Sequence, residues 1–228
     1  MRMLVEKGLD CLDRGDLAAA LRYLEPFARA GDADAQFALG RLWQRGEKVT
    51  KDLGVAIAWL RRAAEAGFTR SYFYLAIAYR DAPHPHRNSK LARFWFTVAA
   101  NSGSVVALRG LAKLYETGIG GQQNYRKAFE LYEKASNLGN REATCALGCL
   151  YLYGYGVAKD VALGIELNRV AADRGCSQAH FNLWVLHSHG TGVPADSGKA
   201  REHLEQAANL GHPEAQFRLA ELDERDET

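Results

Sequence analysis

Apolar residues along this chain recur in blocks of equal length. Within each block they fall three or four residues apart over two stretches of about a dozen residues, the spacing that places side chains on one face of an amphipathic helix. A short turn segment separates the two stretches, and a glycine follows the second one. Each block therefore predicts a first helix (A), a tight turn and a second helix (B), and we expect an all-α chain.

Glycines at the end of each B helix set the period of the blocks. Gly67 follows Gly31 by 36 residues (67 − 31 = 36), and the same step leads through the whole column. Self-similarity at such a period indicates a solenoid of stacked supersecondary units. The glycine column is Gly31, Gly67, Gly103, Gly139, Gly175 and Gly211.

Two further columns keep the same step and mark the two helices. Leucines stand eight positions after each glycine, on the face of helix A that is expected to be buried. An Asp or Asn stands 21 positions after the glycine, and its side-chain oxygen can accept a hydrogen bond from an unpaired amide at the start of helix B. The leucines are Leu39, Leu75, Leu111, Leu147, Leu183 and Leu219, and the capping residues are Asp52, Asn88, Asn124, Asp160 and Asp196, with Asp16 at the matching place before them.

These columns predict one solenoid domain over residues 1–228, a right-handed α-α superhelix of about six 36-residue helix-turn-helix repeats. A single helix pair cannot cover its own apolar faces, so stacked pairs would share a continuous core. The first helix has no neighbour before it, so we expect a monomer or a weak homodimer through a terminal helix. The segments are a divergent repeat at 1–30, full repeats at 31–66, 67–102, 103–138, 139–174 and 175–210, and a capping helix at 211–228.

Composition and charge argue against several classes of function. The chain carries 29 Lys and Arg against 27 Asp and Glu, a formal net charge of +2, which gives no electrostatic case for nucleic acid or an anionic membrane surface. No segment approaches the roughly 20 apolar residues of a membrane helix, and the first residues lack the apolar run of a signal peptide. The four cysteines fall in different columns, so no repeated disulfide is implied, and we expect reduced thiols in a cytoplasmic protein.

Motifs of common catalytic sites are missing from the sequence. No Ser-x-x-Lys, Gly-x-Ser-x-Gly or His-Glu-x-x-His occurs, so acyl transfer and zinc-protease chemistry have no sequence support. The segment 192–200 is similar to a P-loop, but it has one residue too many between its glycines and ends in Ala200 where magnesium needs a hydroxyl. A turn followed by an N-cap explains it better. We therefore expect no catalytic residues and no cofactor.

One metal hypothesis stays open beside the expectation of no metal. Cys145 and Cys149 lie one turn apart on one predicted helix, and Cys176 and His180 are spaced in the same way near the start of the next A helix. A Cys₃His zinc site would follow if the two pairs met between adjacent helices. The alternative is that the cysteines are small core residues, because free cysteine is commonly buried.

Residues that depart from their own column are the candidates for partner binding, because stacking sets the norm within a column. Trp184 stands where most repeats have glycine or alanine. It either anchors a partner as a buried aromatic residue or fills a gap left by His187, which replaces a tyrosine of other repeats. Tyr72 and His180 replace glutamine, and Arg109 replaces phenylalanine. Each of these is either a groove residue or a tolerated packing substitution.

Taken together, the columns resemble the Sel-one-like repeats (SLR), which are relatives of the tetratricopeptide repeats. The resemblance covers nearly the whole chain. The clearest copy has Gly139, Ala143, Leu147-Gly148, Tyr151, Gly154-Tyr155-Gly156-Val157, Asp160 and Ala171-Ala172.

The resemblance implies that the concave face, lined largely by A helices, binds a protein or an extended peptide, so that the chain acts as a non-enzymatic adaptor or scaffold. Some similar bacterial chains are immunity proteins that neutralise a toxic effector, which is the alternative function. A third possibility, a β-lactamase-like hydrolase, is implied only for members with a cysteine pair in each repeat, a pattern absent here.

Overall fold

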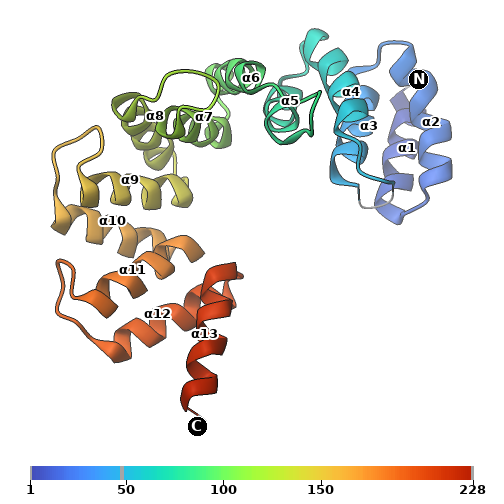
Figure 1. Ribbon diagram of the computed structural model, residues 1–228. Helices are drawn as coiled ribbons and strands as arrows, with labels where there is room; N and C mark the ends of the chain where they lie inside the picture. The colour runs from blue at the N-terminus through green and yellow to red at the C-terminus, as the bar shows by residue number, and fades with distance from the viewer. Residues whose placement is uncertain (1, 47–48, 227–228) are drawn as a thin grey trace. The chain divides into compact units, whose positions relative to one another are not determined.

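The computed structural model describes residues 2–46 and 49–226, which form thirteen α-helices and no strand (Figure 1). The all-α prediction is confirmed, and helices α1 to α12 each span 13 residues. Odd-numbered helices are the predicted A helices and even-numbered ones the B helices. Their bounds are α1 (Arg2–Arg14), α2 (Leu17–Arg29), α3 (Ala33–Arg45), α4 (Leu53–Glu65), α5 (Thr69–Asp81), α6 (Ser89–Asn101), α7 (Val105–Thr117), α8 (Tyr125–Asn137), α9 (Arg141–Tyr153), α10 (Val161–Asp173), α11 (Ser177–His189), α12 (Ser197–Asn209) and α13 (Pro213–Asp226).

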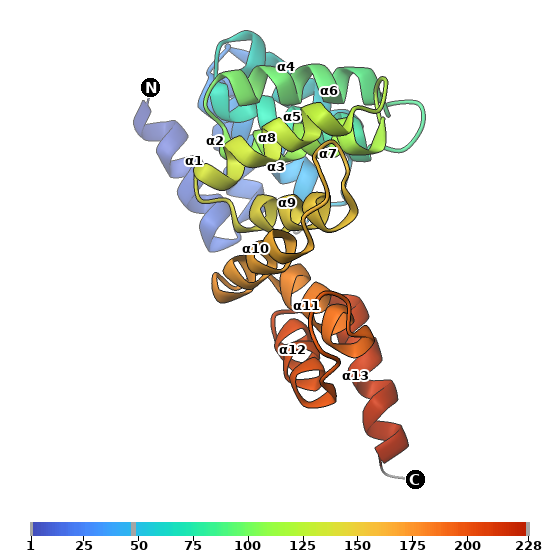
Figure 2. The same ribbon diagram turned by 90° about the vertical axis from the view of Figure 1, so that its left-hand side faces the viewer.

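The helices group into two compact units. Unit 1 comprises Met1–Leu114 and Gly118–Gln122, and unit 2 comprises Tyr115–Thr117 and Gln123–Thr228. In unit 1, α1 to α6 pack in chain order, each against the next. In unit 2, α9 and α10 lie side by side, as do α11 and α12, and α13 packs on α12 (Figure 2). That residues 1–228 form a single domain stays a prediction.

Side chains and glycines set the helix ends as the columns predict. The side chain of each Asp or Asn in the capping column accepts a hydrogen bond from the amide three residues later, at 2.9 to 3.0 Å. These bonds satisfy one of the amides that the first helical turn leaves unpaired. The glycines that follow the B helices have φ between 78° and 101°, a conformation that other residues adopt only with strain.

Two columns of large apolar side chains build the core of each unit. The predicted leucine column on the A helices is between 0% and 6% exposed from Leu39 to Leu183. On the B helices the matching column holds Leu24, Leu60, Phe96 and Leu204, each at most 1% exposed. Asn168 occupies the same column in α10 and is fully buried, so one layer of the core in unit 2 is polar.

The close contact of α9 with α10 depends on two facing glycines. A Cβ atom on Gly164 would lie 2.8 Å from the carbonyl oxygen of Gly148 and 2.7 Å from the Cγ atom of Leu152. Both distances are shorter than van der Waals contact, and a backbone oxygen cannot turn aside as a side chain can. The two helix backbones therefore approach as closely as they do only because neither position carries a side chain.

We expect Gly164→Ala to lower the free energy of unfolding by about 1–3 kcal/mol, the usual cost of overpacking a core. Urea unfolding followed by far-UV circular dichroism measures the change. Gly198→Ala is the matched control, because a Cβ atom there would meet only Asp196 Oδ1, at 3.4 Å. That control should be neutral or slightly stabilising, since alanine is the better helix former. Equal stability of the two variants would contradict the glycine contact.

Candidate functional site

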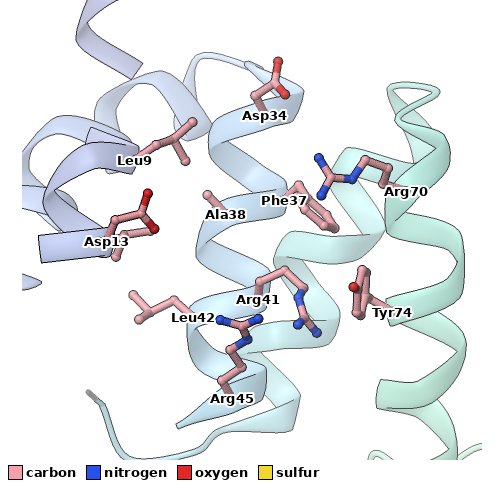
Figure 3. Close-up of a pocket in the computed structure, with 11 residues that line it drawn as sticks. Leu9, Asp13, Asp34, Phe37, Ala38, Arg41, Leu42, Arg45, Arg70 and Tyr74 are labelled. Atoms are coloured by element: carbon pink, nitrogen blue, oxygen red, sulfur yellow. The ribbon is translucent and has the colours of Figure 1, made fainter. Parts of the chain in front are cut away.

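A hollow of about 420 Å³ lies between the A helices of unit 1, α1, α3 and α5 (Figure 3). We call it the basic hollow because three arginines line it. Apolar and aromatic side chains form the rest of its surface, with two aspartates. The lining residues are Leu9, Leu12, Asp13, Asp34, Phe37, Ala38, Arg41, Leu42, Arg45, Arg70 and Tyr74.

Aromatic rings from α3 and α5 form one side of the basic hollow. The Phe37 ring centroid lies 5.5 Å from that of Tyr74 and 5.0 Å from that of Phe68, with both pairs tilted. Phe73 meets Tyr74 edge to face at 5.3 Å. These separations are within the range that aromatic pairs prefer, so the rings form a connected and well-packed surface.

Two of the arginines lie over these rings. The Arg41 guanidinium carbon is 3.6 Å from the Tyr74 centroid, and Nη1 of Arg41 donates to Gln44 Oε1 at 2.7 Å. Gln44 is buried and donates from Nε2 to the Tyr74 carbonyl oxygen at 3.0 Å. The Arg70 guanidinium lies 5.2 Å from the Phe37 centroid. Cation–π attraction at these distances holds both cations in place before any partner arrives.

The opposite side of the basic hollow is apolar. Leu9 and Leu12 come from α1 and Leu42 from α3. Figure 3 shows Asp13 on this α1 side, while Arg41 and Arg70 extend over the rings between α3 and α5. The hollow thus offers an apolar surface beside fixed positive charge.

A second hollow of about 400 Å³ continues along α5 toward α7 and shares Arg70 and Tyr74 with the first. Thr69, Phe73 and Val106 are among its other lining residues. Within unit 1 the A-helix face therefore carries two adjoining hollows, which suit an extended chain better than a compact ligand.

The basic hollow could not be predicted from a column-by-column comparison of the repeats. Arg41 lies ten positions after its glycine and Arg70 only three positions after the next one, so they belong to different columns and meet only when α3 and α5 pack. The available signal was the charge of Arg70, because the matching positions of other repeats hold acidic or uncharged residues: Asp34, Val106, Glu142, Gln178 and Glu214.

Two of the five predicted site residues, Tyr72 and Arg109, belong to unit 1, and His180, Trp184 and His187 belong to unit 2. In unit 1, the Tyr72 ring stacks on Trp95 at 5.7 Å, and Arg109 Nε is buried with no hydrogen-bond partner among the described residues. Trp184 in unit 2 lies 4.9 Å from Phe181, and it lines an open hollow of about 890 Å³. That all five predicted residues bind a partner stays a prediction.

Histidines from α11 and α12 form a cluster in unit 2. The Nδ1 atoms of His180 and His203 are 3.2 Å apart, and the rings of His187 and His203 stack at 5.8 Å. His187, which also lines the hollow beside Trp184, is only 5% exposed, and its Nδ1 atom has no hydrogen-bond partner among the described residues. The predicted residues His180 and His187 thus come together through His203, which is not among the predicted site residues.

The cysteines face a different set of side chains. Asn182 Nδ2 lies 3.3 Å from Cys145 Sγ and 3.2 Å from Cys149 Sγ, and it donates to the buried Asn168 Oδ1 at 2.8 Å. His180 lies against His203 instead. The part of the chain that the structure describes holds no group of three or more His, Cys, Asp or Glu placed to bind a metal.

The structure does not support the Cys₃His hypothesis: the Cys145 thiol meets those of Cys149 and Cys176, but His180 lies against His203. The interpretation of the cysteines as core residues holds for Cys145 and Cys176, which are 2% and 3% exposed. Hydrogen bonds with the Cys149 and Cys176 thiols, together with burial, raise the pKa of Cys145. Its thiol thus stays protonated at neutral pH.

This architecture defines the class of protein to which the chain belongs. Stacked pairs of 13-residue helices at a 36-residue period define the class of helical-repeat, or solenoid, proteins. The chain belongs to the Sel1 repeat family, as its sequence predicts. The family model, described as Sel1 repeat, matches residues 3–32, 33–68, 69–104, 105–140, 141–176 and 177–212. Sel1 repeat proteins generally bind protein partners and are generally not enzymes.

Solved structures of the same fold come from several bacteria. A Sel1 repeat protein from Oxalobacter formigenes is 26% identical, with a TM-score of 0.76 over 91% of this chain and 85% of that one. The protective antigen c5321 of uropathogenic Escherichia coli, which displays an SLR fold, is 27% identical with a TM-score of 0.75. That match covers 96% of this chain but 48% of the antigen. The immunity protein Pa5087 of Pseudomonas aeruginosa, at 20% identity and a TM-score of 0.59 over 81% of this chain and 68% of that one, shows the fold alone.

No curated protein matches the sequence significantly. Among the described residues, every helix is too short or too polar to cross a lipid bilayer.

The histidine cluster predicts a pH dependence of stability. Burial, and then repulsion from His180 and His187, lowers the pKa of His203 from 6.5 to about 4, with Arg169 acting in the same sense and Asp173 against it. The unfolded chain therefore takes up a proton near pH 6.5 that the folded chain refuses until about pH 4. The contribution of neutral His203 to stability is complete above pH 6.5 and is lost as the pH falls toward 4.

We expect His203→Leu to reduce the loss of stability at low pH. Leucine is chosen because Leu167 occupies the matching position of the preceding repeat. Urea unfolding at a series of pH values, followed by far-UV circular dichroism, compares the variant with the wild type. His189→Leu is the control, because His189 is exposed on α11 and lies outside the cluster. If the free energy of unfolding depends on pH equally in His203→Leu and in the wild type, the histidine cluster does not resist protonation.

Proposed function

We propose that this chain is a non-enzymatic adaptor that holds an extended segment of a protein partner along the A helices of unit 1. One observation carries the proposal: the basic hollow presents arginines already fixed over aromatic rings beside an apolar surface. Arginine and aromatic residues are the side chains most often responsible for binding energy at protein interfaces. A partner that meets them loses less freedom on binding, because the receptor side is already ordered.

The dimensions of the site favour a segment over a folded domain. A hollow of about 420 Å³ accommodates a few side chains, and the adjoining hollow of about 400 Å³ extends the same face. An extended peptide places alternate side chains on one side, so it can occupy successive hollows while its other side chains face solvent.

The two alternative functions have weaker support. An immunity protein would bind one folded effector, and this function rests on likenesses of 20% and 22% identity to Pseudomonas aeruginosa immunity proteins, which carry the fold but not the partner. A β-lactamase-like hydrolase rests on a cysteine pattern that this sequence lacks. Hydrolysis of a reporter β-lactam, abolished by a single substitution, would revive the hydrolase.

Site-specific photo-crosslinking tests the proposed face. We expect a photo-reactive residue at Asp34, which is exposed at the edge of the basic hollow, to capture a defined protein in a lysate of the source organism. Mass spectrometry of the adduct should locate the crosslink within one short stretch of the partner, because a segment and not a surface is bound.

The matched control places the same residue at Glu65, an exposed carboxylate on the B helix α4. That position should not capture the same partner. Equal capture from both positions, or crosslinks scattered over a whole partner domain, would contradict segment binding on the A-helix face.

A further inference from the structure

We propose that Cys145, Cys149 and Cys176 form an oxidation site in unit 2, at which a peroxide links Cys145 to Cys176 through a disulfide bond. We call these three residues the thiol cluster. The basic hollow belongs to unit 1, so the inference does not depend on the proposed function. Three observations carry it: the contact among the thiols, their unequal exposure, and their different places on the helices.

The three thiols meet where α9 contacts the start of α11. Cys145 and Cys149 lie one turn apart on α9, and the Cys145 thiol makes hydrogen bonds with the other two thiols. Asn182 Nδ2, on α11, lies 3.3 Å from Cys145 Sγ and 3.2 Å from Cys149 Sγ, so both sulfurs face the same amide. Cys176 packs in the same buried cluster as Cys145. A bond between two of these sulfurs therefore joins groups that are already in contact.

Cys176 supplies a thiolate inside this cluster. Its hydrogen bond with the Cys145 thiol lowers the pKa of Cys176 from 9.0 to about 7, although burial opposes the shift. The backbone amide of Ala179, in the first turn of α11, acts in the same direction as Cys145, and the Glu142 carboxylate acts against it. About half of the Cys176 side chains are therefore thiolates at pH 7, and the thiolate is the reactive form of cysteine.

Exposure determines which thiol meets the oxidant. Cys145 and Cys176 are 2% and 3% exposed, whereas Cys149 is partly exposed. A peroxide in solvent therefore reaches Cys149 before the other two. The Cys149 sulfur takes one oxygen as the oxygen–oxygen bond breaks, which gives a sulfenic acid and one molecule of water.

Cys145 is placed to react with that sulfenic acid. Its sulfur attacks the Cys149 sulfur, the sulfur–oxygen bond breaks, and hydroxide departs. The proton of the Cys145 thiol passes to the hydrogen-bonded Cys176 thiolate, and the hydroxide then takes this proton and leaves as water. Two thiols and one peroxide thus give one disulfide and two molecules of water.

This first disulfide is strained, because both of its cysteines lie on one helix. Residues four apart on a helix have Cβ atoms about 5–6 Å apart, whereas a disulfide requires about 3.5–4.5 Å. Cys176 lies at the N-cap of another helix, so this spacing does not limit it. Its thiolate attacks the Cys145 sulfur and displaces Cys149 as a thiolate, which takes up a proton. The final bond joins α9 to the start of α11.

Disulfide mapping tests the inference on the full chain. Reduced protein is treated with hydrogen peroxide, the remaining thiols are alkylated, and the chain is digested with trypsin without reductant. Cleavage after Lys and Arg leaves Cys145 and Cys149 in the peptide 142–159 and Cys176 in the peptide 175–199. We expect mass spectrometry to find these two peptides linked, with fragment ions that place the bond at Cys145 and leave Cys149 alkylated.

Cys11 and two variants provide the controls. Cys11 is partly exposed, as Cys149 is, but it belongs to unit 1, and its tryptic peptide 8–14 should stay unlinked. Cys176→Ala should abolish the linked pair and leave a bond within 142–159, seen as the loss of two hydrogen atoms. Cys149→Ala should slow the linkage, because both remaining thiols are buried. Far-UV circular dichroism checks that the variants fold, and the mapping of the wild type needs no variant.

The bond should also stabilise the folded chain. It closes a loop of 31 residues (176 − 145 = 31), and such a cross-link restricts the unfolded chain. In urea unfolding, the oxidised protein should have a higher midpoint than the reduced protein, and a reductant should remove the difference. A lower midpoint after oxidation would show that the bond does not fit the native contact of α9 with α11, and would overturn the inference.

Each remaining outcome of the mapping decides one step. A bond confined to 142–159 in the wild type would overturn the transfer to Cys176. Linkage that forms equally fast in Cys149→Ala would overturn the entry of the peroxide at Cys149. Full alkylation of the thiol cluster at a dose that oxidises Cys11 would overturn the site itself. Linked peptides found only in covalent dimers would do the same, because the bond would then join two copies of the chain.

Discussion

Every helix in this protein has an apolar face that it cannot cover by itself, and burial of that face against the next helix determines the rest of the structure. The leucine column on the A helices and the large apolar column on the B helices, which only Asn168 interrupts among the described residues, meet this need. Small residues such as Gly148 and Gly164 then set how closely neighbours approach. Side-chain caps and left-handed glycines fix where each helix starts and stops, so that the apolar faces come into register.

This packing leaves part of each A helix without a structural role. Arg41, Arg45 and Arg70 of unit 1 instead line the basic hollow at the surface of the A helices. The core beneath them nevertheless gives the surface its order, because Gln44 is buried and ties the Tyr74 backbone to Arg41. Binding chemistry can thus change from repeat to repeat while the fold is kept, and each binding group still stands on a rigid helix.

The sequence predicts what repeats and fails to predict what does not. Helix ends, the buried leucines and the family follow from columns, since the same contact recurs at the same offset. The basic hollow does not, because Arg41 and Arg70 come from different offsets of successive repeats and meet only through packing. His203 was missed for a similar reason: its column otherwise holds aromatic and leucine residues, so it resembled a core substitution until His180 and His187 were placed beside it. Departure from a column marked Trp184 and His187 as unusual but could not indicate what they contact.

The buried amide of Asn168 has a consequence for how such a chain can evolve. Apolar layers elsewhere accept any neighbour of suitable volume, so repeats there can be duplicated, deleted or exchanged with little loss. Asn168 instead requires a partner with a directed bond, which Asn182 of the following repeat provides. Inserting a foreign repeat between them would remove the bond from Asn182 and leave the buried Asn168 Oδ1 only the weak thiol donor of Cys145, 3.6 Å away, at a cost of about 1–3 kcal/mol. The two repeats that contain these asparagines are therefore expected to be inherited together, as a unit larger than the repeat itself.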